Sequence, residues 1–327
     1  MPGAQYREPV ESGALQQRTL GRSGLLVSTV GLGCNNFGGR IGFDASRDTI
    51  HAALDAGITL FDTADVYGNR GGSEETLGRV LGERRREIVL ASKFGIAMDD
   101  AGREKGGSRS YILRAVEASL RRLKTDWLDL YQYHRPDEHT PTEETLRALD
   151  DLVRSGKVRY VGCSNMPAWR MADSQWVSST KSLTRFVSCQ DEYSLLHRTP
   201  EKELIPAAEA FGMGLLPYFP LASGLLTGKY RRNQPRPANT RLTNDERLAN
   251  IYLTGERWEK AEKLAEFCDA RGRTLVELAF SWLLSRPVVS SVIAGATSPA
   301  QVATNAAAAE WTLSREDLAA IDGIAPA

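Results

Sequence analysis

The sequence predicts an α/β fold, namely a (β/α)8 TIM barrel with an N-terminal β-hairpin cap and extra C-terminal helices. Eight short strand-like runs alternate with longer helical patterns along the 327 residues. Most of these runs are continuously apolar, which is typical of strands that are buried on both faces. Strands that alternate with helices favour parallel pairing through right-handed crossovers. A doubly wound open sheet is the alternative architecture.

The predicted strands and helices follow one another in regular order. The strands are expected at residues 30–34, 59–63, 88–94, 127–134, 158–164, 186–191, 214–219 and 289–295. The helices begin at capping residues or at a proline in the first turn, and they are expected at 46–57, 73–82, 110–123, 142–156, 167–177, 201–211, 256–271, 274–285, 299–309 and 314–321.

Two segments depart from a plain barrel. Residues 17–29 predict a hairpin around Gly21 to Gly24, placed where it could cap the bottom of the barrel. Residues 221–255 form a long segment rich in Arg, Asn and Pro after the seventh strand. Long loops without secondary structure are usually functional or mobile in a compact domain.

The composition excludes some classes of partner. Lysine plus arginine and aspartate plus glutamate number 41 each, so no excess positive charge draws the chain to nucleic acid or to an anionic membrane. No apolar run reaches the roughly 18 residues of a membrane span. The four cysteines lie outside metal-ligand spacing, which predicts no metal site, and they fit the reducing cytoplasm. Residues 1–16 are expected to form a loosely ordered tail before a single domain at 17–327, and the oligomeric state stays open.

Four polar side chains stand at or just after the ends of neighbouring predicted strands. Asp62 ends the second strand, and Tyr67 follows it in a glycine-rich loop. Lys93 lies near the end of the third strand, and His134 ends the fourth. Because functional groups of a barrel gather at the C-terminal ends of its strands, we expect these four side chains to converge at one mouth.

The chemistry of this set points to proton transfer. A lysine inside a barrel needs a charge partner, which Asp62 supplies. The ammonium of Lys93 is expected to lower the pKa of Tyr67 from its usual value near 10, and His134 can hold a carbonyl oxygen against the phenol. Taken singly, each residue is more often structural. The combination on consecutive strands favours a proton donor for carbonyl reduction, without a metal or a nucleophile.

A barrel glycoside hydrolase is a competing interpretation, because Asp62 and Asp65 could be its two carboxylates. The position of Lys93 beside Asp62 argues against it, since a paired carboxylate is a poor general acid.

Several motifs resemble those of the aldo-keto reductase family, and the resemblance covers nearly the whole chain. They are "FDTADVYG", "ASKFG", "YQYHRPD", "VRYVGCSN", "CQDEYSLL" and "PYFPLASGLLTGKY". The resemblance implies an NAD(P)H-dependent oxidoreductase that reduces an aldehyde or ketone to an alcohol, reversibly, with a small-molecule carbonyl or alcohol as substrate. It assigns the catalytic roles to Asp62, Tyr67, Lys93 and His134, with Tyr67 as the proton donor in reduction.

The resemblance also implies how the cofactor is held, with NADP(H) expected and NAD(H) as the alternative. The carboxamide of nicotinamide is assigned to residues 164, 165 and 190, the ring to residue 218, the pyrophosphate to the loop at 219–229, and the adenosine end to residues 295–305. The full set of expected contacts is Cys34, Asn35, Asp62, Ser164, Asn165, Gln190, Tyr218, Phe219, Pro220, Leu221, Ser223, Lys229, Gly295, Thr297, Gln301 and Asn305.

Three residues depart from the family pattern and leave the NADP preference open. Phe219 stands where a serine is common, Thr297 where a lysine, arginine or serine is common, and Thr304 where a glutamate is common. Lys229, Arg231 or Arg232 could compensate for the missing phosphate contact. The segment "GLGCNN" at 31–36 also lacks the third glycine of a dinucleotide fingerprint, which weakens the open-sheet alternative.

A second function is compatible with the same motifs. The chain could be a cofactor-sensing regulatory subunit resembling the potassium-channel beta subunits, which share the fold and the four catalytic residues and act mainly by binding a partner.

Overall fold

The computed structural model describes residues 15–327. Within that range, eight parallel strands form one sheet in the order β10-β3-β4-β5-β6-β7-β8-β9, which confirms the predicted barrel. The strands are β3 (Val30–Gly33), β4 (Leu60–Asp62), β5 (Val89–Phe94), β6 (Leu128–Tyr133), β7 (Val158–Ser164), β8 (Phe186–Glu192), β9 (Gly214–Tyr218) and β10 (Val292–Gly295). The expected N-terminal tail lies outside the described residues except for its last two positions.

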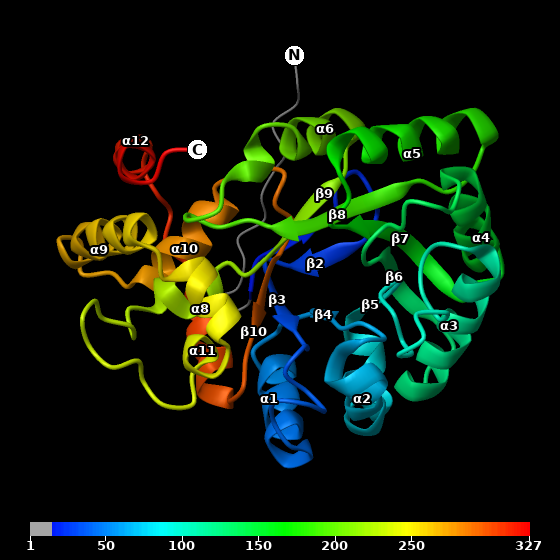
Figure 1. Ribbon diagram of the computed structural model, residues 1–327, viewed down its shortest axis with the longest axis horizontal. Coiled ribbons are helices and arrows are strands. Elements are labelled where there is room, and N and C mark those ends of the chain that lie inside the picture. The colour runs from blue at the N-terminus through cyan, green and yellow to red at the C-terminus, as the bar shows by residue number, and fades with distance from the viewer. Residues whose placement is uncertain (1–14) are drawn as a thin grey trace.

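Helices surround the strands (Figure 1). The helices that follow the barrel strands are α1 (Phe43–Asp55), α2 (Tyr67–Val80), α3 (Arg109–Leu123), α4 (Thr142–Arg154), α5 (Ala168–Lys181), α6 (Leu204–Phe211), α10 (Leu275–Leu284) and α11 (Pro299–Ala307). The extra helices are α7 (Arg241–Asn244), α8 (Glu246–Tyr252), α9 (Gly255–Asp269) and α12 (Arg315–Ile324). Three short 3-10 helices complete the order, at η1 (Gly82–Glu87), η2 (Thr199–Glu201) and η3 (Ala222–Thr227).

The predicted hairpin is present as β1 (Gln17–Thr19) and β2 (Leu26–Ser28), which pair in antiparallel fashion. Its apolar side chains share one buried cluster with inward-facing residues of the barrel strands. That cluster consists of Leu20, Val27, Leu60, Val89, Ala91, Leu130, Leu216 and Ile293. The hairpin therefore plugs one end of the barrel, and the strand ends that bear the candidate site face the other end.

The seam between β9 and β10 closes the barrel through a single bridge, Leu215↔Val289. The hairpin reinforces this seam from outside the sheet. The guanidinium of Arg18 donates to the carbonyl oxygen of Val289 at 2.9 Å and to that of Leu284 at 2.8 Å. The backbone N–H of Gly21 donates to the Ser290 hydroxyl at 3.3 Å.

The long segment after β9 is more ordered than its composition indicates. It contains η3, α7 and α8, and it is anchored by side chains that are buried, Leu242 and Tyr252 among them. Phe219, Ala222 and Ser223 adopt left-handed backbone conformations with φ of 53°, 47° and 55°. Such conformations are unfavourable for residues with a Cβ, so the surrounding packing holds this loop in its shape.

No helix among the described residues has both the length and the apolar character that a membrane crossing requires.

Candidate active site

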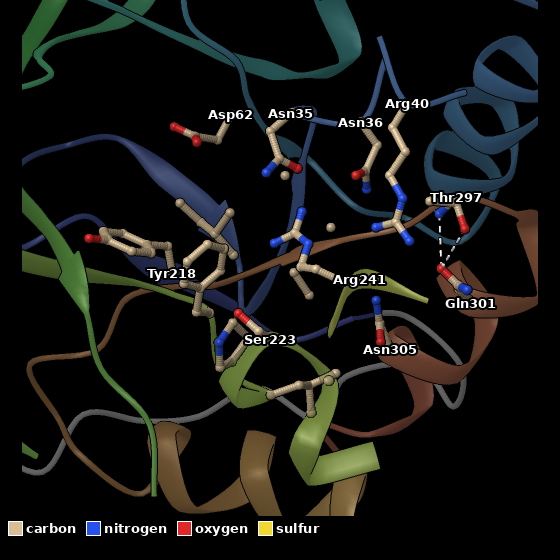
Figure 2. Close-up of a pocket in the computed structure, with 18 of the residues that line it drawn as sticks. Asn35, Asn36, Arg40, Asp62, Tyr218, Ser223, Arg241, Thr297, Gln301 and Asn305 are labelled. Atoms are coloured by element: carbon tan, nitrogen blue, oxygen red, sulfur yellow. Dashed lines mark hydrogen bonds between the residues drawn. The ribbon is translucent and has the colours of Figure 1, made fainter. Parts of the chain in front are cut away.

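A cavity of about 640 Å³ opens at the C-terminal ends of the strands. Figure 2 shows Asp62 and Tyr218 on one side of it and Thr297, Gln301 and Asn305 on the other. Most of the residues expected from the sequence line it, namely Asn35, Asp62, Tyr67, His134, Ser164, Asn165, Gln190, Tyr218, Phe219, Pro220, Leu221, Ser223, Lys229, Gly295, Thr297, Gln301 and Asn305. Lys93 and Cys34 are not among the lining residues.

Glycines determine where Tyr67 lies. Residues 68–71 have left-handed or related backbone conformations, so α2 is regular only beyond them. A Cβ on Gly68, whose φ is 66°, would lie 2.5 Å from the carbonyl oxygen of Phe37, and a Cβ on Gly38 would lie 2.4 Å from the backbone of Gly72. Only glycine allows the loops after β3 and β4 to pack so closely, and this packing fixes Tyr67 at the cavity wall.

Lys93 links the carboxylate to the phenol. Its ammonium donates to Asp62 Oδ2 at 2.6 Å, to the carbonyl oxygen of Thr63 at 2.9 Å and to the Tyr67 hydroxyl at 3.4 Å. The Lys93 side chain is fully buried and that of Asp62 nearly so. Burial alone would lower the pKa of Lys93, but Asp62 and Tyr67 together outweigh the burial and raise the pKa. The ammonium therefore stays charged beneath the phenol.

The pKa of Tyr67 departs from the sequence-based expectation, which was a lowered value. Burial raises the pKa of Tyr67 above its ordinary value of 10.0, and the nearby Lys93 ammonium offsets only part of this effect. The expectation was wrong in sign because it counted the neighbouring charge and not the loss of hydration. The phenol is therefore protonated at neutral pH.

His134 completes the set. Its ring meets that of Tyr67 edge-on, with the ring centroids 5.6 Å apart. Burial, together with the charges of Lys93 and Arg135, lowers the pKa of His134 to about 2. A neutral imidazole keeps one N–H donor, so His134 can donate a hydrogen bond to a ligand oxygen at any working pH.

Gln132 is a member of the site that the sequence reasoning missed. Its amide donates to Asp62 Oδ1 at 3.0 Å, and the amide of Gln190 donates to the same oxygen at 2.9 Å. Gln132 lies on β6, and His134 directly follows that strand, two residues later. Alternation along an extended chain therefore places both side chains on the same face. A polar residue on the inward face of a buried strand was the signal that could have found it.

Some polar atoms near Tyr218 hydrogen-bond within the described part of the chain, and others have no partner there and could contact a ligand. The Asn165 amide donates to the carbonyl oxygen of His134 and to the Ser164 hydroxyl, and its oxygen accepts from the Tyr218 hydroxyl at 2.7 Å. Asn165 therefore acts as a brace within the protein. The hydroxyl hydrogen of Ser164 and the amide oxygen of Gln190 remain for a ligand.

The opposite end of the cavity lies at β10 and the start of α11. The backbone N–H of Thr297 donates to the Gln301 side-chain oxygen at 2.9 Å, and the Thr297 hydroxyl donates to the same oxygen at 3.2 Å (Figure 2). Ser298 caps α11, and the nearly buried Asn305 lines the wall. Thr297 and Gln301 thus hydrogen-bond each other, and neither side chain carries a charge.

Four cations line this cavity: Arg135, next to His134, and three further along the wall, of which Arg40 and Arg241 were not expected from the sequence. Arg40 follows β3, Arg241 begins α7, and Lys229 follows η3. Lys229, Arg231 and Arg232 were the residues expected to replace the missing phosphate contact. Of these, only Lys229 lines the cavity, and Arg232 instead pairs with Glu262. Basic residues in loops after barrel strands were the signal for Arg40.

Cys34 has a structural position between elements. It is fully buried, its backbone N–H donates to the carbonyl oxygen of Asp62, and its own carbonyl accepts from the Ser73 hydroxyl at 2.8 Å. These bonds connect β3, β4 and α2 behind the cavity wall. In the described part of the chain, no group of three or more His, Cys, Asp and Glu side chains is arranged to hold a metal ion.

Asp62, Lys93, Tyr67 and His134 thus place a buried ion pair, a protonated phenol and a neutral imidazole at one mouth of the barrel. Residues 29–326 match the model of the aldo/keto reductase family. The chain belongs to this family.

Relatives cover nearly the full chain. An uncharacterized oxidoreductase of Bacillus subtilis (strain 168) is 36% identical over 317 residues, which are 94% of this chain and 95% of that protein. The L-glyceraldehyde 3-phosphate reductase of Escherichia coli (strain K12) is 36% identical over 324 residues, 96% and 93% of the two chains. A probable voltage-gated potassium channel subunit beta of Oryza sativa subsp. japonica is 37% identical over 297 residues, 89% and 90%.

Proposed function

We propose that the protein is an NAD(P)H-dependent oxidoreductase that reduces an aldehyde or ketone to an alcohol, reversibly. The observation that supports this most is the hydrogen-bonded series Asp62–Lys93–Tyr67 beside a neutral His134 at the cavity wall. It provides a protonated phenol, a buried ammonium next to it and a neutral hydrogen-bond donor. These three groups are what a carbonyl oxygen requires as it gains charge.

The residues of the cavity fit a nicotinamide dinucleotide. The free atoms of Ser164 and Gln190 can hydrogen-bond a carboxamide, and the Tyr218 ring offers a face for stacking. Lys229, Arg40 and Arg241 supply positive charge for phosphates further along the wall. We therefore assign the nicotinamide to the side of Asp62 and Tyr218, and the adenosine to the side of Thr297 and Asn305.

The chain's own residues account for the proton side of the reaction. The reduced nicotinamide supplies a hydride to the carbonyl carbon. Tyr67 donates its hydroxyl proton to the carbonyl oxygen, and His134 holds that oxygen by a hydrogen bond. The Lys93 ammonium stabilises the phenolate that remains on Tyr67, and Asp62 with its two amide donors keeps the ammonium in place. In the oxidation direction, the phenolate accepts the proton of the alcohol.

The test uses a panel of aldehydes and ketones with NADPH and NADH, and it follows the oxidation of the reduced nicotinamide. Tyr67→Phe keeps the ring and removes the proton, so turnover is expected to fall by about 10²- to 10⁴-fold. The dissociation constant for the nucleotide, measured by fluorescence titration, is expected to stay within about twofold of the wild-type value. Loss of turnover and nucleotide binding together would instead indicate a structural role for Tyr67.

A cofactor-sensing regulatory subunit is the second candidate, because one relative is a probable potassium channel subunit beta. Such a sensor would bind the nucleotide and release product too slowly for repeated turnover. Single-turnover and steady-state rates on the best substrate separate the two functions. A fast single turnover followed by almost none would favour the sensor.

We further propose that residues 17–327 act as one domain in the cytoplasm. All four cysteines lie in the described part of the chain, unpaired and buried, which suits a reducing compartment.

A further inference from the structure

Positive charge accumulates on one part of the cavity wall without a matching negative charge. Arg40 and Arg241 reach into the same part of the cavity from different elements (Figure 2). Burial, and then the charges of Arg40 and Arg241, lower the pKa of Lys229. Among residues 15–327, none of these three cations forms an ion pair or a side-chain hydrogen bond. Most other arginines of the structure do pair with a carboxylate, as Arg122 does with Glu74.

The arrangement is unfavourable without a ligand. Burial, and then the charge of Arg40, lowers the pKa of Arg241. A guanidinium does not lose its proton in a protein, so the charge remains and its cost remains with it. The carboxylate of Asp245 acts at longer range, but it is engaged as the cap of α8, where it accepts from the Leu248 N–H. An anion with more than one charge would relieve this repulsion.

The ring of Phe219 holds Arg241 in place. The guanidinium carbon lies 5.2 Å from the ring centroid, which is a cation–π geometry. Phe219 itself is held between the rings of Tyr218 and Tyr252, both edge-on. The aromatic residue that replaces the usual serine thus positions a guanidinium, while the fork of nitrogen donors stays available.

We propose that Arg40 and Arg241 form the site for the phosphate on the 2′ oxygen of NADP(H), and that Arg40 is the residue that distinguishes NADPH from NADH. This inference rests on the proposed function, because it places the nicotinamide at Asp62 and the adenosine near Thr297. In Figure 2, Arg40 lies on the Thr297 side of the cavity, far from Asp62.

The chemistry of the ligand supports the assignment. A phosphate monoester bears about −1.5 to −2 charges at neutral pH, whereas each phosphate of the pyrophosphate bridge is a diester-like monoanion. Two guanidinium groups match a dianion and can each bind it through two parallel hydrogen bonds. Thr297 and Gln301 cannot replace them, since they are uncharged and hydrogen-bond each other.

The experiment compares the dissociation constants of NADPH and NADH for the wild type, Arg40→Gln and Arg231→Gln by fluorescence titration. Arg40 is exposed, so its variant is expected to fold normally, which thermal melting checks. Arg231 is a matched exposed arginine that does not line the cavity. Arg40→Gln is expected to weaken NADPH binding by about 10- to 100-fold and to leave NADH within about twofold. Arg231→Gln is expected to change neither.

A second measurement isolates the phosphate itself. Adenosine 2′,5′-bisphosphate and adenosine 5′-monophosphate compete for the adenosine end, and only the first bears the 2′-phosphate. Arg40→Gln is expected to remove the advantage of the bisphosphate. Equal weakening of NADPH and NADH binding by Arg40→Gln would overturn the inference by placing Arg40 at the pyrophosphate. Unchanged dissociation constants for both dinucleotides would overturn it as well. A wild type that binds neither dinucleotide would overturn the proposed function together with the inference.

Discussion

At one end of the cavity the Asp62 carboxylate and the Lys93 ammonium satisfy each other at 2.6 Å, whereas at the other end Arg40, Arg241 and Lys229 have no anionic partner among the described residues. The paired charges sit on barrel strands β4 and β5, which are held by the sheet. The unpaired charges come from segments that follow strands, including the long segment after β9. The same barrel thus presents one end that is finished by its own residues and one that a ligand would complete.

This difference separates charges that the protein pairs internally from charges that it leaves free to pair with a ligand. Asp62 and Lys93 are fixed before any ligand arrives, which would remove the need for reorganisation during the proposed proton transfer. The cations are held apart from any counter-ion, so the free energy released on pairing remains for binding. Without nucleotide, removing a charge should therefore lower the free energy of unfolding at the paired end and leave it unchanged or raise it at the unpaired end.

The largest effect is expected from Lys93→Met, which leaves Asp62 buried and unpaired. Removal of one partner of a buried ion pair costs about 3–5 kcal/mol, and turnover should fall by at least the amount expected for Tyr67→Phe. Urea unfolding and steady-state kinetics measure the two losses. Lys105→Met is the matched control, because Lys105 is exposed and has no charge partner among the described residues. A Lys93→Met variant as stable as this control would contradict the view that the pair anchors the site.

Asp65 is a buried carboxyl that forms no ion pair among the described residues, in contrast to Asp62. Burial, and then the charge of Glu74, raises the pKa of this carboxyl from 3.8 to about 7. Among residues 15–327, the Tyr111 hydroxyl is the one side chain that donates a hydrogen bond to it, at 3.2 Å. Because the folded state then holds this proton more tightly than the unfolded chain, stability should fall as the pH rises from about 4 to about 7. The slope is up to about 1.4 kcal/mol per pH unit.

Asp65→Asn removes this titration, so the variant should gain stability relative to the wild type across that pH range. Urea unfolding at several pH values measures the difference. Asp126→Asn is the control, because Asp126 is exposed and should leave the slope unchanged. Parallel curves for Asp65→Asn and the wild type would show that Asp65 ionises in the folded protein as it does in water.

The smallest effect, of opposite sign, is expected from Arg241→Met in protein without nucleotide. Methionine keeps much of the apolar contact with Phe219 and removes the unpaired charge, so the free energy of unfolding should be unchanged or higher by about 1 kcal/mol. Thermal melting without NADPH measures the cost of the unpaired charge, and melting with NADPH adds the contribution of Arg241 to nucleotide binding. NADPH should stabilise the wild type more than the variant. A clear loss of stability without nucleotide would mean that Arg241 is structural.

Much of the site could be predicted from local sequence. Asp62, Lys93 and His134 stand at strand ends that a short apolar run defines, and the barrel then brings parallel strand ends together. Gln132 was within reach of the same reasoning, since it lies two residues before His134 and so shares its face of the strand. The proximity of Arg40 and Arg241 was not, because they lie 201 positions apart and no local pattern relates the loop after β3 to α7. The sign of the pKa shift at Tyr67 also depends on burial, which tertiary packing determines.

The seam between β9 and β10 has a consequence for the order in which the chain can fold. Arg18 reaches partners 266 and 271 positions later in the sequence, so these two hydrogen bonds can form only after the chain as far as Val289 has been made. Contacts so distant in sequence form late and slowly. During synthesis on the ribosome, the hairpin can pack against the early strands, whereas its hydrogen bonds across the seam must wait until nearly the whole cylinder is made.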